Sequence, residues 1–260
     1  MFIRFYSHRR YIWHTAWNDF RYYYAGTGLG VFWNIINPLL QVLLYTIVFS
    51  KLLVIRAYAP TETPFVLYLC VGLFPWLAFS ETIIQGSNAF FDNATYLKRL
   101  ALPPEIFVAK EVLRTTFNLG VALLLLMLLN VLWGQGADWN WLLLPVMGLM
   151  LQGLGMGLTM GLAGLRVLFP DLGEVLRVLM QLWMWTMPIV YPVAIIPAEA
   201  QPWLKLNPPY LFIASIRQIY LAGQAPAWSD WLMMLAWSSL FIGLGGLILH
   251  QLRHEIRDNI

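Results

Sequence analysis

Uncharged apolar stretches dominate this chain, and six of them are about as long as a membrane-spanning helix. Such a helix needs roughly 20 apolar residues at 1.5 Å of rise per residue. The second stretch is the shortest, and we expect its helix to continue past Glu81 to about Ala89. The pattern predicts an all-α membrane protein with six transmembrane helices. The stretches without Asp, Glu, Lys or Arg are Tyr22–Ser50, Thr63–Ser80, Thr115–Ala137, Trp139–Leu165, Val178–Ala198 and Trp231–Gln251.

A further apolar region, Trp203–Leu221, does not read as a span. The run Asn207-Pro208-Pro209 interrupts it, and it carries Lys205 and Arg217. We interpret it as a pair of short re-entrant or interfacial helices, within an extracytoplasmic segment at 197–229, because irregular backbone at membrane depth must be surrounded by protein or water. A β-barrel is disfavoured, since the apolar runs are continuous and Leu-rich rather than alternating.

Composition supports a membrane protein. The chain of 260 residues is 60% hydrophobic and only 11% charged, whereas a soluble domain carries about 25% charged residues. Its many aromatic residues suit two membrane interfaces. The net charge of +3 is too small to indicate a nucleic-acid partner. The single cysteine, Cys70, lies in an apolar run and reads as a small core residue.

The basic residues predict the orientation of the chain. With six spans, Arg4, Arg9, Arg10, Arg21, Lys98, Arg99, Lys110, Arg114, Arg166, Arg177, Arg253 and Arg257 lie on one side, and Lys51, Arg56, Lys205 and Arg217 lie on the other. Lys and Arg concentrate on the cytoplasmic side of membrane proteins. Both termini are therefore expected in the cytoplasm, with outer loops near 55–62, 134–140 and 197–230.

Residues 2–24 form a segment that is amphipathic and not a span. Trp13, Trp17, Phe20 and Tyr24 share one helical face, and basic residues such as Arg10 occupy another. This pattern predicts a helix that lies in the membrane interface, with its basic side toward anionic headgroups. An ordinary amphipathic helix packed on the protein is the alternative.

The cytoplasmic connection 90–104 contains a short piece that can form a helix. It runs from Asn93 to Leu100 and is ended by Pro103-Pro104. A short, partly apolar helix in the cytoplasm needs something to pack against, which favours a docking helix for a soluble partner. A plain loop with positive charges is the alternative.

Three other features have a structural and a functional interpretation. Asp171 and Glu174 have the spacing of a capping box, and with Arg166 they are also candidates for a gate. Glycines 153, 157 and 161 form a stripe that favours close packing of helices. Glu81 lies inside a span, where a carboxylate marks either a pathway or a charge pair.

Several kinds of chemistry find no support in the sequence. The dipeptide Gly-Lys does not occur, so there is no Walker A loop. The four histidines lack the spacing of a metal site, and no G-x-S-x-G motif indicates an acyl-transfer site. We therefore expect neither catalytic nor metal-binding residues and no cofactor on this chain.

A set of ordered motifs resembles one family along most of the chain. The first is Arg21-Tyr22-Tyr23 with Leu29-Gly30, Trp33 and Pro38; the next are Gly72-Leu73-Phe74-Pro75-Trp76, Asn93, Leu97-Lys98-Arg99 and Leu102-Pro103; the last are Arg166, Phe169-Pro170-Asp171, Met187-Pro188-Ile189-Val190-Tyr191-Pro192 and Asn207-Pro208 through Arg217. In this order they are similar to the permease subunit of ABC-2 type polysaccharide exporters, the O-antigen, capsule and teichoic-acid group. Pro209 departs from the aliphatic residue of many relatives.

The resemblance implies an architecture and partners. The chain would be a single ABC-2 type transmembrane domain over 1–260 and would form a homodimer with a central channel in the bacterial inner membrane. A separate dimeric ABC ATPase, which binds Mg-ATP, would dock on a coupling helix. The cargo would be a lipid-linked polysaccharide, held in a membrane whose lipids contact the interface helix.

The same resemblance suggests roles for particular residues. The coupling residues would be Asn93, Tyr96, Leu97, Lys98 and Arg99. Aromatic rings that stack on sugars in a channel would be Trp76, Trp183, Trp185 and Tyr191, with anchoring at the membrane interface as the favoured alternative for any one of them. Cations for the lipid pyrophosphate would be Arg4, Arg9, Arg10 and Arg21. Gate candidates are Glu81, Arg166 and Asp171.

Two other functions remain open at this stage. An ABC-2 permease for a drug or a simple lipid would share most of these features. A membrane enzyme that acts on lipid-linked intermediates would need clustered acids or histidines at one interface, and the acids Glu81, Asp92, Glu105 and Glu111 are scattered.

Overall fold

The described part of the chain is helical in a computed structural model. It comprises residues 2–22, 27–48, 65–99, 102–132, 138–253 and 255–256. The expected outer loop at 55–62 and most of that at 134–140 lie outside these residues. The helices and 3-10 turns are α1 (Phe2–Ser7), α2 (Arg9–Tyr22), η1 (Gly30–Phe32), α3 (Trp33–Thr46), α4 (Phe65–Ser87), α5 (Ala89–Asp92), α6 (Ala94–Arg99), α7 (Glu105–Leu132), η4 (Trp139–Leu142), α8 (Leu143–Leu168), α9 (Leu172–Trp185), η5 (Val193–Ile195), α10 (Gln201–Leu204), α11 (Pro208–Ala222) and α12 (Trp228–Gln251).

Four segments of the described chain are long and apolar enough to cross a membrane. They are Phe65–Ser87, Glu105–Val131, Trp139–Leu168 and Trp228–Gln251. Each coincides with one of the expected spans, and the helix through Glu81 continues to Ser87, close to the predicted Ala89. These helices confirm a multi-pass membrane protein.

The other two expected spans contain shorter helices. The helices α3 and α9 have 14 residues each, which is about 21 Å of rise. The predicted bounds of the fifth span were wrong, because α9 begins at Leu172 rather than at Val178 and ends at Trp185 rather than near Ala198. Pro188 follows at the point where the helix has stopped, and proline removes a backbone donor.

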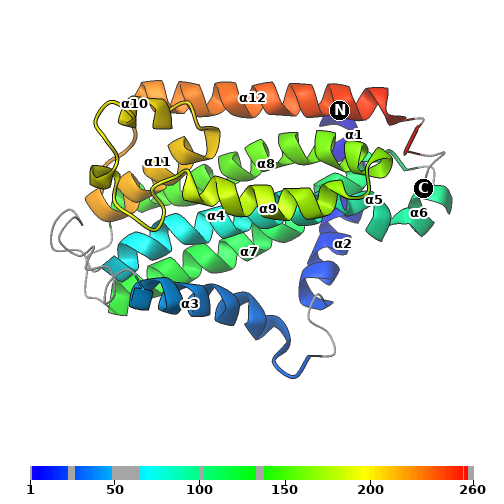
Figure 1. Ribbon diagram of the computed structural model, residues 1–260. Coiled ribbons are helices and arrows are strands. Elements are labelled where there is room, and N and C mark those ends of the chain that lie inside the picture. Colours follow the sequence, from blue (N-terminus) through cyan, green and yellow to red (C-terminus); the bar gives the residue numbers. More distant parts are fainter. Residues whose placement is uncertain are drawn as a thin grey trace.

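The helices form an elongated bundle with two distinct ends (Figure 1). The helices α1, α5, α6 and the last turns of α12 lie at one end, which we call the α6 end. The helices α10 and α11 and the start of α12 lie at the opposite end, the α10 end. Segments that were expected on the same side of the membrane thus share one end of the molecule.

The helix α4 is the centre of the bundle. It is buried along most of its length and contacts α3, α7, α8, α9 and α11. A small polar cluster also joins its neighbours, because the Thr82 hydroxyl lies 2.7 Å from Thr115 on α7 and 2.5 Å from Gln152 on α8. Such interhelical hydrogen bonds hold helices together where lipid offers no competing partner.

Glycines bring α8 and α12 into backbone contact. A Cβ atom on Gly157 would lie 2.5 Å from the backbone of Ile242, and the carbonyl of Gly157 touches Gly245. Gly161 also faces Gly245, whereas a Cβ on Gly153 would meet nothing within 4 Å. The predicted packing stripe is confirmed for Gly157 and Gly161, and the inclusion of Gly153 was wrong because no neighbouring atom approaches that position.

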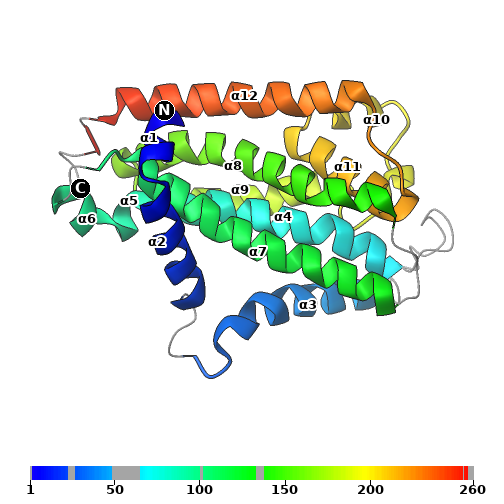
Figure 2. The same ribbon diagram turned by 180° about the vertical axis from the view of Figure 1, so that it is seen from behind.

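The amphipathic helix α2 packs against the protein. Figure 2 shows it running steeply across α7 near the α6 end. The rings of Trp13, Trp17 and Phe20 all contact Phe117 of α7, with centroids 5.3–5.7 Å apart. Its aromatic face is therefore at least partly covered by α7, as in the packed alternative, while Trp13 and Trp17 stay half exposed.

Candidate functional site

The short helix α6 is anchored by one face and open on the other. Leu97 is buried, whereas Tyr96, Lys98 and Arg99 are exposed. Asn93, just before α6, is also buried; its amide donates to the Ala89 carbonyl at 2.8 Å and accepts from Lys110 at 3.0 Å. The predicted helix is confirmed, and its exposed cations do not take part in packing α6 against the bundle.

A chain of buried charges leads from Asn93 into the bundle. Lys110 lies 2.7 Å from Asp19 of α2 and 3.0 Å from Glu111. Arg114 then joins Glu111 at 3.0 Å and Glu81 of α4 at 3.1 Å. Because each charge has an opposite partner, charged residues can occupy this buried part of α7. Glu81 is thus a member of a charge pair, one of the two interpretations of its position.

Two of the gate candidates, Arg166 and Asp171, lie near the junction of α8 and α9, whereas Glu81 faces α7. Arg166 donates to the Ser87 hydroxyl at 3.1 Å, lies over the Phe91 ring and presses on Gly173, where any side chain would collide. The predicted capping box was wrong: the Asp171 side chain makes no capping bond, and Glu174 pairs with Arg177 at 3.0 Å instead. Asp171 is exposed.

Asp92 adds an acidic group to the same end of the bundle. Partial burial, reinforced by the carboxylate of Glu111, raises the pKa of the Asp92 carboxyl, and the neighbouring cations oppose that rise only in part. A carboxyl with these surroundings holds its proton more readily than one in water.

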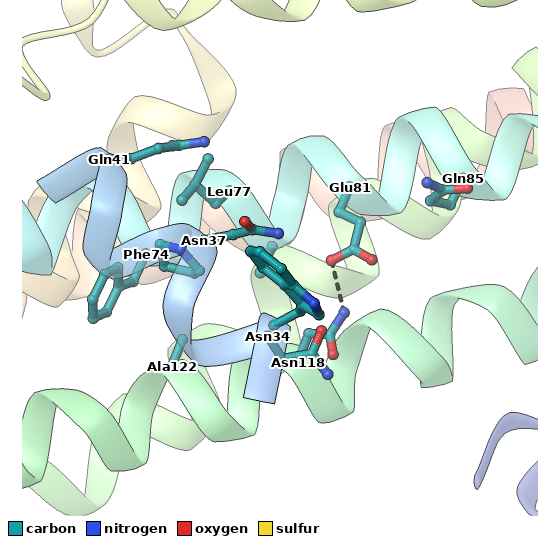
Figure 3. A pocket seen from close by; sticks show the side chains of 12 residues that line it. Asn34, Asn37, Gln41, Phe74, Leu77, Glu81, Gln85, Asn118 and Ala122 are labelled. Atoms are coloured by element: carbon teal, nitrogen blue, oxygen red, sulfur yellow. Dashed lines mark hydrogen bonds between the residues drawn. The ribbon is translucent and has the colours of Figure 1, made fainter. Parts of the chain in front are cut away.

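A pocket opens beside Glu81, between α3, α4 and α7 (Figure 3). Its volume is about 240 Å³. Figure 3 shows the Glu81 carboxylate turned toward Asn118, whose amide donates to it at 2.8 Å. The residues that line it are Trp33, Asn34, Asn37, Pro38, Gln41, Phe74, Leu77, Ala78, Glu81, Gln85, Asn118 and Ala122.

Most of the pocket's polar residues were not predicted from the sequence. The sequence reasoning followed charged residues, and α3 carries none. Asn34, Asn37 and Gln41 nevertheless have the spacing of one helical face within the apolar segment Trp33–Thr46. Three carboxamides on one face of a membrane helix are a signal that could have identified the site.

The aromatic channel candidates split into buried and open rings. Trp76 is only 2% exposed and packs edge-on against Trp183 at 6.1 Å. The Trp183 indole donates to Asn207 at 3.1 Å. Trp185 is exposed, and the Tyr191 hydroxyl donates to its carbonyl at 2.9 Å. Trp76 is a core residue of this chain, and channel lining by the four rings stays a prediction.

Arg217 fixes the loop that follows α9. It is buried on α11 and donates to the carbonyls of Pro188 and Ile189, the latter at 2.6 Å, and to the Tyr68 hydroxyl at 2.9 Å. A side chain on Gly72 would collide with its guanidinium. Sequence reasoning counted Arg217 as an outer charge and as the last residue of one family motif, and it missed this role.

The cations proposed for a lipid pyrophosphate lie on α2 and just before it. Arg9 is exposed; its guanidinium lies 4.2 Å from the centre of the Tyr6 ring and donates to the Tyr6 carbonyl at 2.9 Å. Arg10 and Arg21 are exposed as well. The side chain of Arg4 lies outside the described part of the structure.

Comparison with known proteins decides the family. Residues 10–221 match the family described as ABC-2 type transporter. The chain belongs to the ABC-2 type transporter family. This membership confirms that the protein is a transport protein of the kind that the ordered motifs indicated.

Individual relatives of this ABC-2 type transporter align along nearly its whole length. It is 28% identical to the O-antigen export system permease protein RfbA of Myxococcus xanthus, over 91% of this chain and 90% of that protein. It is 25% identical to a protein of the same name from Klebsiella pneumoniae, over 79% and 78%. Identity to the polysialic acid transport protein KpsM of Escherichia coli is 25%, over 87% of each.

Proposed function

We propose that this chain is the channel-forming permease subunit of an ATP-driven exporter that moves a lipid-linked, O-antigen-like polysaccharide out of the cytoplasm across the bacterial inner membrane. The observation that carries the proposal is the similarity, over about nine-tenths of both chains, to a protein named as an O-antigen export permease. Similarity to a polysialic acid transport protein supports the broader class, transport of a polysaccharide.

The direction of the chain supports six crossings. The Asp19–Lys110 pair holds α2 at the α6 end, whereas α4 must begin at the α10 end, because Ser87 at its far end contacts Arg166. The chain therefore traverses the bundle between α2 and α4. Helical backbone from 30 to 48 lies in that connection, and 19 residues rise about 28 Å, nearly one hydrocarbon thickness.

The same argument applies to α9. The helix α8 ends at the α6 end, and α12 begins at the opposite end, because Gly157 faces Ile242 and Gly164 faces Leu252. The chain between Leu168 and Trp228 must return along the bundle, and α9 lies on that path. We infer a sixth crossing that is completed by the non-helical loop after Trp185, with both termini in the cytoplasm.

Energy would come from a separate dimeric ABC ATPase that holds Mg-ATP. The exposed residues Tyr96, Lys98 and Arg99 suit a docking surface, since α6 packs on the bundle through the buried Leu97. Asn93 links α6 to the charge chain through Lys110. A movement of α6 would therefore be transmitted through this chain of charges to Glu81. Two copies of the permease would enclose the channel.

The lipid anchor would meet the cations of the N-terminal segment. Arg9, Arg10 and Arg21, with Arg4, carry positive charge at the α6 end, and guanidinium groups bind phosphate oxygens in a bidentate manner. We therefore infer that a pyrophosphate would be recognised on the cytoplasmic side, before the polymer enters the bundle. Arg166, at the same end, would serve as part of a gate with Asp171 and Glu81.

Genetic complementation with co-purification tests this function. We expect deletion of this protein to abolish surface polysaccharide and the wild-type protein to restore it, with an ABC ATPase co-purifying. The double variant Lys98→Glu/Arg99→Glu should lose both the ATPase and export while it stays in the membrane. The matched control is Lys205→Glu at the α10 end, where the side chain is 63% exposed, and it should export normally.

Other results would contradict the proposal. Normal surface polysaccharide in the deletion strain would point to a different cargo, such as a drug or a simple lipid. Modification of a polyprenyl-phosphate substrate by the purified protein alone would indicate an enzyme. Unchanged ATPase binding by the charge-reversed variant would refute docking through α6.

A further inference from the structure

The pocket between α3, α4 and α7 has an unusually polar lining for a membrane protein. Five carboxamides face it, from Asn34, Asn37, Gln41, Gln85 and Asn118. Asn34, Gln85 and Asn118 are half-buried, whereas Asn37 and Gln41 are exposed on α3. On an apolar membrane helix such polar side chains need hydrogen-bond partners, because lipid tails offer none. A pocket that served only for packing or for apolar lipid would not need them.

Several of these amides have capacity to bind a ligand. Within the described residues, the side chains of Asn34, Asn37 and Gln41 make no hydrogen bond to another group, and the Asn118 carbonyl oxygen is buried without a partner. Each carboxamide offers both donors and an acceptor. A sugar hydroxyl is likewise donor and acceptor, so the two kinds of group are matched.

The electrostatics favour an uncharged ligand over an anionic one. Of the described residues that line the pocket, Glu81 alone is charged, and its charge is negative. Arg114 neutralises it from the buried side at 3.1 Å. A phosphate or pyrophosphate would meet this carboxylate without a cation in front of it, whereas a neutral hydroxyl can donate to the carboxylate.

The size and the aromatic lining favour one ring. Small-molecule sites usually measure about 300–1,000 Å³, so a cavity near 240 Å³ has room for a single small ring but not for a folded length of polymer. Trp33 and Phe74 supply flat apolar faces within the same lining, and such faces suit the C–H surface of a pyranose.

We propose that this pocket binds one uncharged sugar unit of the exported polysaccharide, with Asn34, Asn37 and Gln41 of α3 as its hydrogen-bonding side. The inference rests on the proposed function and adds to it a site for the sugar that is separate from the arginines assigned to the lipid pyrophosphate. Glu81 connects this site to the charge chain that reaches Asn93, so an occupied pocket is mechanically linked to α6.

Binding to the full-length protein in lipid nanodiscs tests the site. The probe is the neutral oligosaccharide repeat released by mild acid from the organism's own surface polysaccharide, detected by saturation-transfer NMR. The test variant is Asn37→Leu/Gln41→Leu, because Leu removes the hydrogen bonds at similar volume and suits a membrane helix. We expect it to bind the repeat at least fivefold more weakly than the wild type.

The matched control is Leu40→Ala/Leu44→Ala on the same helix. Both leucines are more than half exposed and do not line the pocket, so binding should equal that of the wild type. Inorganic pyrophosphate, as a second probe, should not displace the repeat. Equal binding by the pocket variant, equal loss in the control, displacement by pyrophosphate or no binding to the wild type would each overturn the proposal.

Export separates this inference from the proposed function. In the complemented deletion strain, the pocket variant should deliver at least fivefold less surface polysaccharide than the wild type, with normal ATPase binding. If the wild type exports and the pocket variant exports at the same rate, the pocket is not a sugar site and the exporter stands. If the wild type itself does not restore export, the exporter assignment fails.

Discussion

Single residues explain how closely the helices of this transporter approach one another. Gly157 and Gly245 put the backbones of α8 and α12 in contact, and Arg217 gathers two carbonyls of the loop after α9 around one guanidinium. In both cases the residue type is dictated by space and donor geometry, not by hydrophobicity. These positions give the sharpest predictions about stability.

Replacing Gly157 by alanine should weaken the protein. The new methyl group would meet the backbone of Phe241 and Ile242, which cannot rotate away, and overpacking costs about 1–3 kcal/mol. We expect the apparent melting temperature of the purified protein in detergent to fall by several degrees. Gly153→Ala, on the same helix with open space around it, should be neutral or slightly stabilising; equal effects of the two changes would contradict the backbone contact.

Replacing Arg217 by lysine should release the loop at Pro188 and Ile189. An ammonium group cannot reach two carbonyls and a hydroxyl with the fixed fork of a guanidinium, and unpaired buried acceptors cost about 1–3 kcal/mol each. Limited proteolysis should then cut the segment between α9 and α10 faster. Arg177→Lys is the control, because Arg177 is exposed and exposed ion pairs such as Glu174–Arg177 contribute little to stability. Unchanged cleavage of Arg217→Lys would show that Arg217 does not hold the loop after α9.

Helices differ in how far the sequence could predict them. The bounds of α12 and α4 follow from hydropathy, because lipid or core surrounds them on every side. Hydropathy did not predict the N-terminal third of α7, since Lys110, Glu111 and Arg114 interrupt the apolar pattern. These charges neutralise one another inside the bundle. The end of α9 at Trp185 was also not predicted, because the interaction that holds the next loop comes from α11, far along the chain.

Local sequence features could likewise predict only part of the candidate site. The short helix α6 could be predicted from local features, namely Asn93 before it and the prolines after it. The pocket could not be found by following charges, because α3 contributes neutral amides, and only the fold brings them opposite Glu81 and Asn118. The pairing of Glu81 with Arg114 likewise depends on the alignment of α4 with α7.

The link between α4 and α7 predicts strong energetic coupling of Glu81 with Arg114. Removing one member leaves a buried charge, which costs about 3–5 kcal/mol, so Arg114→Gln should be severely destabilising. Adding Glu81→Gln should recover about 1–3 kcal/mol of that loss, measured by SDS-driven unfolding in mixed micelles. The exposed pair Glu174–Arg177, treated in the same way, should show a coupling energy near zero. If the effects of the Glu81 and Arg114 substitutions are strictly additive, these two side chains do not form a stabilising charge pair.

At the scale of the whole molecule, the two ends of the bundle carry different work. The α6 end gathers the cations of α2, the exposed face of α6, the charge chain and Arg166, whereas the α10 end consists of the loops and short helices held by Arg217. The proposed exporter needs this polarity, because its ATPase and lipid anchor would act in the cytoplasm and its polymer would leave on the other side. The arrangement makes the orientation of the chain a decisive test.

Single cysteines at three exposed positions report that orientation. The native Cys70 is fully buried, so it should not react with a membrane-impermeant maleimide. In intact spheroplasts we expect Glu199→Cys, near the α10 end, to be labelled, and Thr95→Cys in α6 to react only after the membrane is opened. Ser7→Cys in α1 should behave like Thr95→Cys, because a crossing by α3 is required to return the chain from the α6 end to the start of α4. Labelling of Ser7→Cys from outside, together with protection of Thr95→Cys, would mean that the segment containing α3 does not cross and that the six-span topology is wrong.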